Sequence, residues 1–390
     1  MSKNKKVYLC LAHMSGSEMD FIREAFDTNW VVPLGPNVDG FESDLERFVG
    51  EGKRVVALSS GTAAVHLGML CLGVGPGDEV ICQSFTFAAS CNPARYLGAT
   101  PVFVDSEEKT WNIDPNLLED AVKDRIRKTG RKPKAIVPVY MYGMPAYIDE
   151  VMEVSRLYGI PVLEDSAEAF GSEYRGRMTG TFGEYGVMSF NGNKMITTSG
   201  GGALVCPDLE AKRRVMFYAT QAREDRPYYL HEEIGYNYRM SNVCAGIGRG
   251  QMTVARGHIA HHRRLASLYE AAFSGHPAVR FHGEPEDYMR SNFWLSTVTF
   301  EGGRGGSSVM EPLPVVTEVM SALAAEGIES RPLWRPMHTQ PVYRDAPAYV
   351  NGTCERLFRK GLCLPSGPCV DESDARRVVD TILKVVEGVV

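Results

Sequence analysis

The sequence predicts an α/β fold, with a mostly parallel sheet between helices and a smaller C-terminal α/β domain. Between residues 61 and 189, helix-like and strand-like stretches alternate, as is typical of a parallel sheet covered on both faces. The chain has 390 residues, more than the roughly 250–300 at which a single core stops growing. We therefore expect a large domain over residues 1–258, with an N-terminal arm, and a small domain over residues 259–390.

The elements follow from local signals. Helices are expected at 62–74, 87–98, 115–128 and 147–159, and strands at 78–83, 101–105, 134–140 and 160–165. Asp114 is a typical helix N-cap, and Pro115 suits the first position of the helix. Further along, we expect a hairpin-like piece at 191–205, one long helical run at 245–273, and an exposed glycine-rich turn at 302–308.

Composition excludes several classes of protein. The chain is 44% hydrophobic and 23% charged, as soluble globular proteins are, and its net charge of −6 offers no basic surface to nucleic acid or an anionic membrane. Nine cysteines without a CxxC pair favour free thiols in a reducing compartment over a disulfide frame or a zinc site. No segment approaches 18 apolar residues. We expect a cytoplasmic protein with no metal and no nucleic-acid or membrane partner.

Two local features suggest anion and ring binding. Ser60, Gly61 and Thr62 precede an alanine-rich helix, where free N–H groups and the helix dipole favour a phosphate. A simple serine cap would explain the same residues. Asp165 ends a predicted strand at the edge of the sheet where ligands bind. There it would hold a cationic ring nitrogen or cap the following turn.

Two further features complete the pattern. Lys194 lies in a turn of small residues, where a desolvated amine can react with an aldehyde, and a solvated turn lysine is the alternative. The polar, aromatic segment 235–240 is either a binding loop or a structural loop. Pyridoxal 5′-phosphate requires a site for its phosphate, a ring to stack on, a partner for its ring nitrogen and an amine for its aldehyde. The chain offers these in order: the phosphate cradle, the aromatic segment SFTFAAS at the end of a strand, Asp165, and Lys194, which is 29 residues after Asp165.

The chain resembles the sugar aminotransferases of the DegT/DnrJ/EryC1/StrS type, which are pyridoxal phosphate enzymes of fold type I. The resemblance covers nearly the whole chain and is carried by SSGTAAVHLGMLCLGVGPGDEV, QSFTFAAS, PVYMYGMPAYIDEV, LEDSAEAFGSEYRGRMTG, SFNGNKMITTSGGG, IGYNYRMSN and RPLWRPMHTQPVY. It implies a sheet of the seven-stranded type in the large domain. Because the related sugar 3-dehydratases carry His at the lysine position, Lys194 places the chain outside that branch.

The resemblance also implies roles for single residues. Lys194 matches the lysine that binds the cofactor aldehyde and later moves a proton. Asp165 matches the aspartate that pairs with the ring nitrogen, and Phe87 the aromatic residue that stacks on the ring. The phosphate-holding groups are matched by Ser60, Gly61, Thr62 and Ser189. Asn237 matches an asparagine that reaches the cofactor phosphate of a neighbouring subunit, which implies a homodimer with shared active sites.

One position departs from many family members, which have His or Gln where this chain has Glu168. The resemblance implies that this carboxylate lies close to the cofactor's ring or its phenolic oxygen, so Glu168 is a candidate catalytic and cofactor-binding residue. Members with Glu there, with SFNGNK around the lysine and with PLWRPMH late in the chain, resemble sugar 4-aminotransferases. This implies transfer of an amino group from L-glutamate to a nucleotide-linked 4-keto-6-deoxyhexose, first of all the UDP-linked N-acetyl sugar of glycan synthesis, through pyridoxamine 5′-phosphate. The candidates for binding the sugar nucleotide are Arg239, Arg331 and His338. Alternatives are 3-amination, a dTDP- or GDP-linked ketosugar, and a non-catalytic regulator on the same fold.

Overall fold

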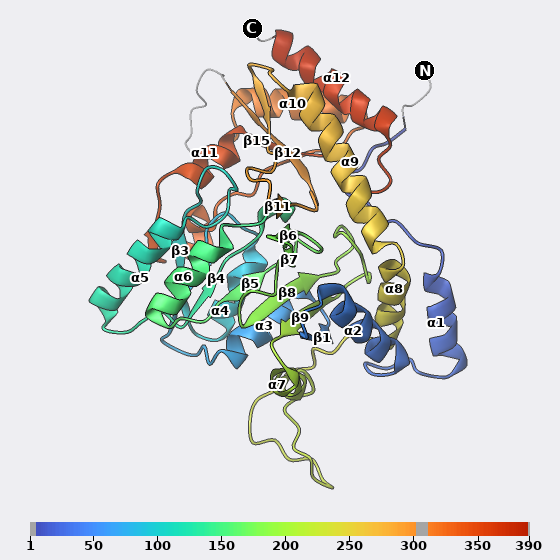
Figure 1. Ribbon diagram of the computed structural model, residues 1–390, viewed down its shortest axis with the longest axis vertical. Helices are drawn as coiled ribbons and strands as arrows, with labels where there is room; N and C mark the ends of the chain where they lie inside the picture. Colours follow the sequence, from blue (N-terminus) through green and yellow to red (C-terminus); the bar gives the residue numbers. More distant parts are fainter. Residues whose placement is uncertain (1–4, 302–310, 389–390) are drawn as a thin grey trace.

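The computed structural model describes residues 5–301 and 311–388, so the predicted turn at 302–308 lies outside the described residues. At its centre, two four-stranded sheets, β1-β9-β8-β5 and β4-β2-β3-β14, are joined by parallel bridges between β4 and β5 (Figure 1). The strands are β1 (Arg54–Leu58), β2 (Glu79–Gln83), β3 (Thr100–Val104), β4 (Ala135–Val137), β5 (Leu163–Asp165), β8 (Tyr185–Ser189), β9 (Gly202–Cys206) and the two-residue edge strand β14 (Ala348–Tyr349). Within the described residues, β9 is the one strand of this sheet that runs antiparallel to its neighbours. The predicted mostly parallel sheet is confirmed.

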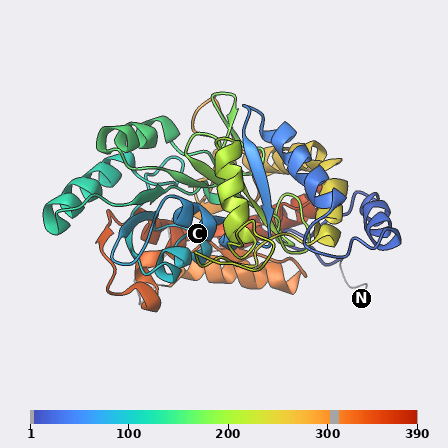
Figure 2. The same cartoon turned by 90° about the horizontal axis from the view of Figure 1, so that it is seen from below.

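Helices cover both faces of the sheet (Figure 2). They are α2 (Pro36–Val49), α3 (Gly61–Cys71), α4 (Asn92–Tyr96), α5 (Pro115–Thr129), α6 (Ile148–Tyr158) and α7 (Leu209–Ala219). On β2, Val80 and Cys82 join the core formed with α3, α4 and α7, whereas Ile81 joins the core formed with α5 and α6. Because successive strand residues point to opposite faces, two-sided burial explains the continuous apolar strands.

The C-terminal part of the chain forms a second sheet with the order β10-β12-β15-β13, in which every pairing is antiparallel. Its strands are β10 (Val279–Phe281), β12 (Ser296–Phe300), β13 (Arg331–Pro332) and β15 (Gly361–Leu364), and the helices of this region are α9 (Ala255–Phe273), α10 (Pro314–Ala325), α11 (Thr353–Lys360) and α12 (Glu372–Gly388). A small sheet of β6 (Glu173–Tyr174), β7 (Arg177–Met178) and β11 (Met289–Arg290) connects the two regions. The domain division at residue 258 stays a prediction.

Two predicted helices are wrong as single elements. The run 245–273 is two helices, α8 (Asn242–Met252) and α9, because the N–H groups of Thr253 and Val254 bond to carbonyls three residues back and end the α-helical ladder. The stretch 87–98 divides into a 3₁₀ turn, η1 (Ala88–Ser90), and α4. The predicted capping is confirmed, since the Asp114 carboxylate accepts the first free N–H groups of α5.

The N-terminal arm and the long inter-helix segment complete the chain. Helix α1 (Glu18–Asp27) packs on α8. The segment between α7 and α8 projects away from the body of the molecule (Figure 1), and Tyr228, Tyr229 and Ile234 in it are exposed.

All nine cysteines are free thiols. In the described part of the chain, no helix is long and apolar enough to cross a membrane.

Candidate active site

A cavity of about 310 Å³ opens at the carboxyl ends of the central strands. Among its lining residues are eight of the predicted site residues: Ser60, Gly61, Thr62, Phe87, Asp165, Glu168, Ser189 and Lys194. They come from the ends of β1, β5 and β8 and from the turns that follow β2 and β8. The parallel sheet thus gathers at one edge side chains that are up to 134 residues apart in the chain (194 − 60).

The amino end of α3 forms one end of the cavity. The Ser60 hydroxyl caps the helix by accepting the N–H of Ala63 at 3.0 Å. The N–H groups of Gly61 and Thr62 have no acceptor within the helix and face the cavity end with the positive pole of the helix dipole. Close approach explains the glycines here, since a Cβ on Gly202 would lie 2.4 Å from the Gly61 nitrogen and one on Gly61 would lie 3.0 Å from the Ser189 Cβ.

The two carboxylates at the end of β5 point to opposite sides. Asp165 lines the cavity, is 4% exposed, and accepts hydrogen bonds from Ser90 Oγ at 2.6 Å and the Ala167 N–H at 3.1 Å. Burial raises the pKa of Asp165, while these two donors and the nearby Lys194 ammonium lower it in part. Glu164 is fully buried on the other side and accepts hydrogen bonds from Tyr140 and from three backbone N–H groups. Only Asp165 is therefore available to a ligand.

Lys194 lies between a carboxylate and an aromatic ring. Its Nζ is 3.6 Å from Glu168 Oε1 and 3.7 Å from the centre of the Trp294 ring. The other carboxylate oxygen of Glu168 accepts the Tyr142 N–H at 2.8 Å. Burial raises the pKa of Glu168, and the Lys194 ammonium opposes that rise. The lysine side chain is 14% exposed, so its amine is largely withdrawn from water, as a nucleophilic amine requires.

Two tryptophans of the cavity wall were missed by the sequence analysis. Trp294 donates from Nε1 to the Asn193 carbonyl at 2.6 Å, next to the lysine. Trp334 has its ring centre 5.4 Å from that of Phe87, which is 54% exposed and lines the cavity. Trp334 belongs to the PLWRPMH segment on which the family resemblance partly rests, a signal that could have found it. No local pattern marks Trp294.

The other four predicted residues do not line the cavity. Asn237 is exposed in the segment between α7 and α8, and Arg239 follows it beside the end of β1. Arg331 pairs with Glu329 at 2.7 Å on the surface. The His338 ring is held at both nitrogens, 2.7 Å from Ser84 Oγ and 2.9 Å from Glu355 Oε1. The substrate-binding roles of these residues stay predictions.

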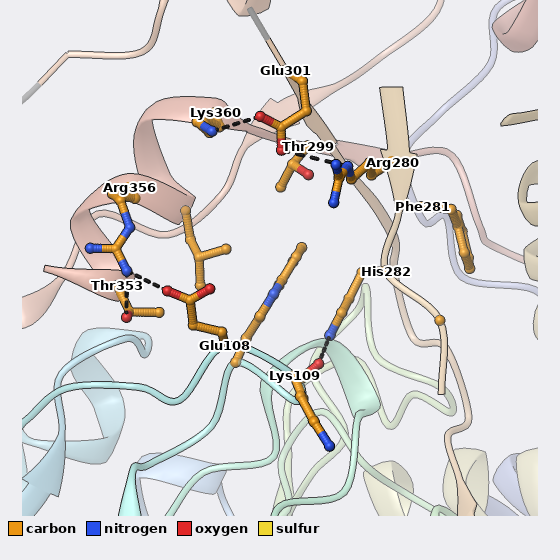
Figure 3. A pocket seen from close by; sticks show the side chains of 13 residues that line it. Glu108, Lys109, Arg280, Phe281, His282, Thr299, Glu301, Thr353, Arg356 and Lys360 are labelled. Atoms are coloured by element: carbon orange, nitrogen blue, oxygen red, sulfur yellow. Dashed lines mark hydrogen bonds and ion pairs between the residues drawn. The ribbon is translucent and has the colours of Figure 1, made fainter. Parts of the chain in front are cut away.

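A second cavity, of about 340 Å³, contains none of the predicted residues (Figure 3). Arg356 pairs across it with Glu108 at 2.6 Å, and Lys360 pairs with Glu301 at 2.9 Å. The rings of Trp111 and His282 stack with their centres 3.6 Å apart. The contacts of Glu108 and Trp111 tie the loop after β3 to α11 and to the end of β10, and the Lys360–Glu301 pair ties α11 to the end of β12. They connect the two sheets rather than form part of the site at the central strands.

The central sheet, with a lysine and two buried carboxylates in a cavity at its carboxyl edge, defines a transferase of fold type I, the class of pyridoxal phosphate enzymes. The model of the DegT/DnrJ/EryC1/StrS aminotransferase family matches residues 13–383, and the chain belongs to this family. Enzymes of the family are pyridoxal phosphate-dependent sugar aminotransferases, and the protein is one of them rather than a non-catalytic regulator.

Relatives match over almost the whole chain. "Putative pyridoxal phosphate-dependent aminotransferase EpsN" of Bacillus subtilis is 45% identical over 97% of this chain and 96% of its own length. GDP-perosamine synthase of Caulobacter vibrioides is 34% identical over 99% of this chain and 100% of its own. Among solved structures, DesV of S. venezuelae is similar with a TM-score of 0.85, at 30% identity over 95% of both chains.

Proposed function

We propose that the protein moves an amino group from L-glutamate to C-4 of a nucleotide-linked 4-keto-6-deoxyhexose, for glycan or polysaccharide synthesis. The observation that carries the proposal is the meeting of Lys194 with two buried carboxylates in one cavity, Glu168 at 3.6 Å from the amine and Asp165 at the cavity wall. The UDP-linked N-acetyl sugar is our first candidate. The name of the relative from C. vibrioides supports a GDP-linked sugar as the second.

The lining residues fit pyridoxal phosphate. When bound, this cofactor supplies an aldehyde for amines and a ring that delocalises the electrons released at the substrate carbon. The free N–H groups of Gly61 and Thr62, with the hydroxyl of Ser189, suit its phosphate. The exposed Phe87 ring suits its face, and the buried Asp165 carboxylate its ring nitrogen. We assign these residues to cofactor binding.

Lys194 acts as the base in both halves of the reaction. In the first half its Nζ would take the proton from the Cα of L-glutamate and pass it to the bound cofactor, and in the second half it would take a proton back from the cofactor and deliver it to C-4 of the sugar. One amine serves both halves because it stays on one side of the cavity. Glu168, with its Oε1 3.6 Å from Nζ, holds the amine on that side of the cavity.

A panel of ketosugars tests the substrate. The loaded protein is incubated with L-glutamate and with 4-keto and 3-keto sugars linked to UDP, dTDP or GDP, and the position of the new amine is determined by NMR. We expect a 4-amino product, with one nucleotide preferred by at least about tenfold, a difference of about 1.4 kcal/mol in transition-state binding. Conversion of a 3-keto sugar alone would contradict the C-4 assignment.

We also propose a cytoplasmic homodimer with shared sites. The nine free thiols suit a reducing compartment. The exposed Asn237 and the projecting, tyrosine-rich segment before it favour contact with a second copy. Light scattering should then give about 86 kDa, twice the 43.0 kDa of one chain. A mass of one chain at micromolar concentration would exclude sharing of sites.

A further inference from the structure

We infer that Thr86 and Ser90 are positioning residues, which hold the Asp165 carboxylate in one orientation toward the cofactor. Both hydroxyls lie in the turn after β2 and line the cavity with Asp165. Thr86 Oγ1 is 2.8 Å from Ser90 Oγ, which is 2.6 Å from Asp165 Oδ2. The inference rests on the role proposed for Asp165 as the partner of the ring nitrogen.

The direction of these hydrogen bonds follows from the chemistry of the groups. An ionised carboxylate only accepts, so the Ser90 hydroxyl donates to Asp165. With its hydrogen committed, Ser90 Oγ accepts the Thr86 hydroxyl. The result is a one-way chain from Thr86 through Ser90 to Asp165, in which each bond polarises the next. The three side chains are 1%, 2% and 4% exposed, so water does not compete.

Asp165 needs such donors because it is buried. Its other oxygen accepts the Ala167 N–H at 3.1 Å, so donors hold both ends of the carboxylate and restrict its rotation. The charged and titratable groups that act on it are Lys194, Glu168 and the thiol of Cys91. Burial raises the pKa of Asp165, and the Ser90 hydroxyl is the foremost group that lowers it. Without that hydroxyl, the carboxylate takes up a proton at a higher pH and loses its attraction for a cationic ring.

The test compares Ser90→Ala with Ser106→Ala. Ser106 is a matched control, since it is also buried but its hydroxyl has no hydrogen-bond partner among the residues that the structure describes. The dissociation constant of pyridoxal phosphate and the pH profile of turnover are measured from pH 6 to 9. Loss of a hydrogen bond to a charged group weakens binding by about tenfold or more. We expect Ser90→Ala to bind the cofactor about tenfold more weakly at low pH and to approach the wild type at high pH.

Further variants separate positioning from loss of structure. Ser90→Thr keeps the hydroxyl and should restore both the affinity and the acid limb of the profile. Thr86→Val removes the donor to Ser90 but leaves the bond from Ser90 to Asp165, so it should shift the acid limb to higher pH by less than Ser90→Ala does. This variant provides the test if Ser90→Ala does not fold. The inference would be overturned if Ser90→Ala and Ser106→Ala had the same affinity for pyridoxal phosphate and the same acid limb in the pH profile of turnover.

Asp165→Asn distinguishes this failure from failure of the proposed function. If Asp165→Asn has the cofactor affinity and the turnover rate of the wild type, the role proposed for Asp165 is wrong, and the inference about Thr86 and Ser90 is wrong as well. If Asp165→Asn is impaired while Ser90→Ala matches the control, the role of Asp165 stands and only the hydroxyl chain is rejected.

Discussion

Replacing Lys194 with alanine should lower turnover by about 10⁴-fold and abolish the visible absorbance of the bound cofactor. In the proposed reaction the side chain is both the amine that bonds the aldehyde and the base that moves the proton, and a positioned base alone contributes about 10²–10⁴-fold. The variant also leaves the buried Glu168 without its cation at 3.6 Å. Turnover under saturating substrate and the absorbance spectrum of the purified protein are the measurements.

Two controls make the Lys194 result specific. Lys194→Arg restores a cation beside Glu168 but supplies no nucleophilic amine, so it should stay inactive. Lys384→Ala removes an exposed lysine of α12 and should behave as the wild type. Turnover in Lys194→Ala within tenfold of the wild type would show that another group is the base.

Replacing Glu164 with leucine should lower the free energy of unfolding by about 4 kcal/mol or more. Its carboxylate accepts the N–H groups of Gly180, Phe182 and Gly183 at 2.8, 2.6 and 2.6 Å and the hydroxyl of Tyr140. Leucine has a similar volume but accepts none of these hydrogen bonds, and each donor left buried without a partner costs about 1–3 kcal/mol. The denaturant midpoint, with the slope of the transition, measures the loss.

Glu153→Leu is the control for Glu164, because that glutamate is exposed on α6 and its loss should change stability by less than about 0.5 kcal/mol. Activity gives a second comparison. The folded fraction of Glu164→Leu should retain turnover, since Glu164 does not line the cavity. A variant as stable as the wild type would mean that the loop 180–183 finds other acceptors.

The pair Glu164 and Asp165 shows how far local sequence carries the prediction. A strand that ends in two carboxylates was predicted, and it lies where expected, as β5. Asp165 was chosen for the site because it is the last residue of the predicted strand, and the family resemblance agreed with that choice. In the structure it follows from strand geometry, because neighbouring side chains point to opposite faces and only one face opens to the cavity.

Other features were beyond the sequence analysis. The break between α8 and α9 interrupts a stretch that was expected to be one helix. The contact of Lys194 with Trp294 joins residues 100 positions apart (294 − 194). His338 carries no local mark of the two partners that hold its ring nitrogens, Ser84 and Glu355.

The sequence by itself determined the class of fold, the order of most elements around the site, and the candidate phosphate cradle, aspartate and lysine. These depend on neighbours in the chain: a serine cap, an alternation of helix and strand, a turn of small residues. Only the tertiary structure decided which carboxylate faces the cavity. It also brought Ser90 to Asp165, 75 positions away in the chain, and packed the Trp294 ring against Lys194. Such contacts form when the whole sheet packs and buries its helices, and packing leaves no local pattern in the chain.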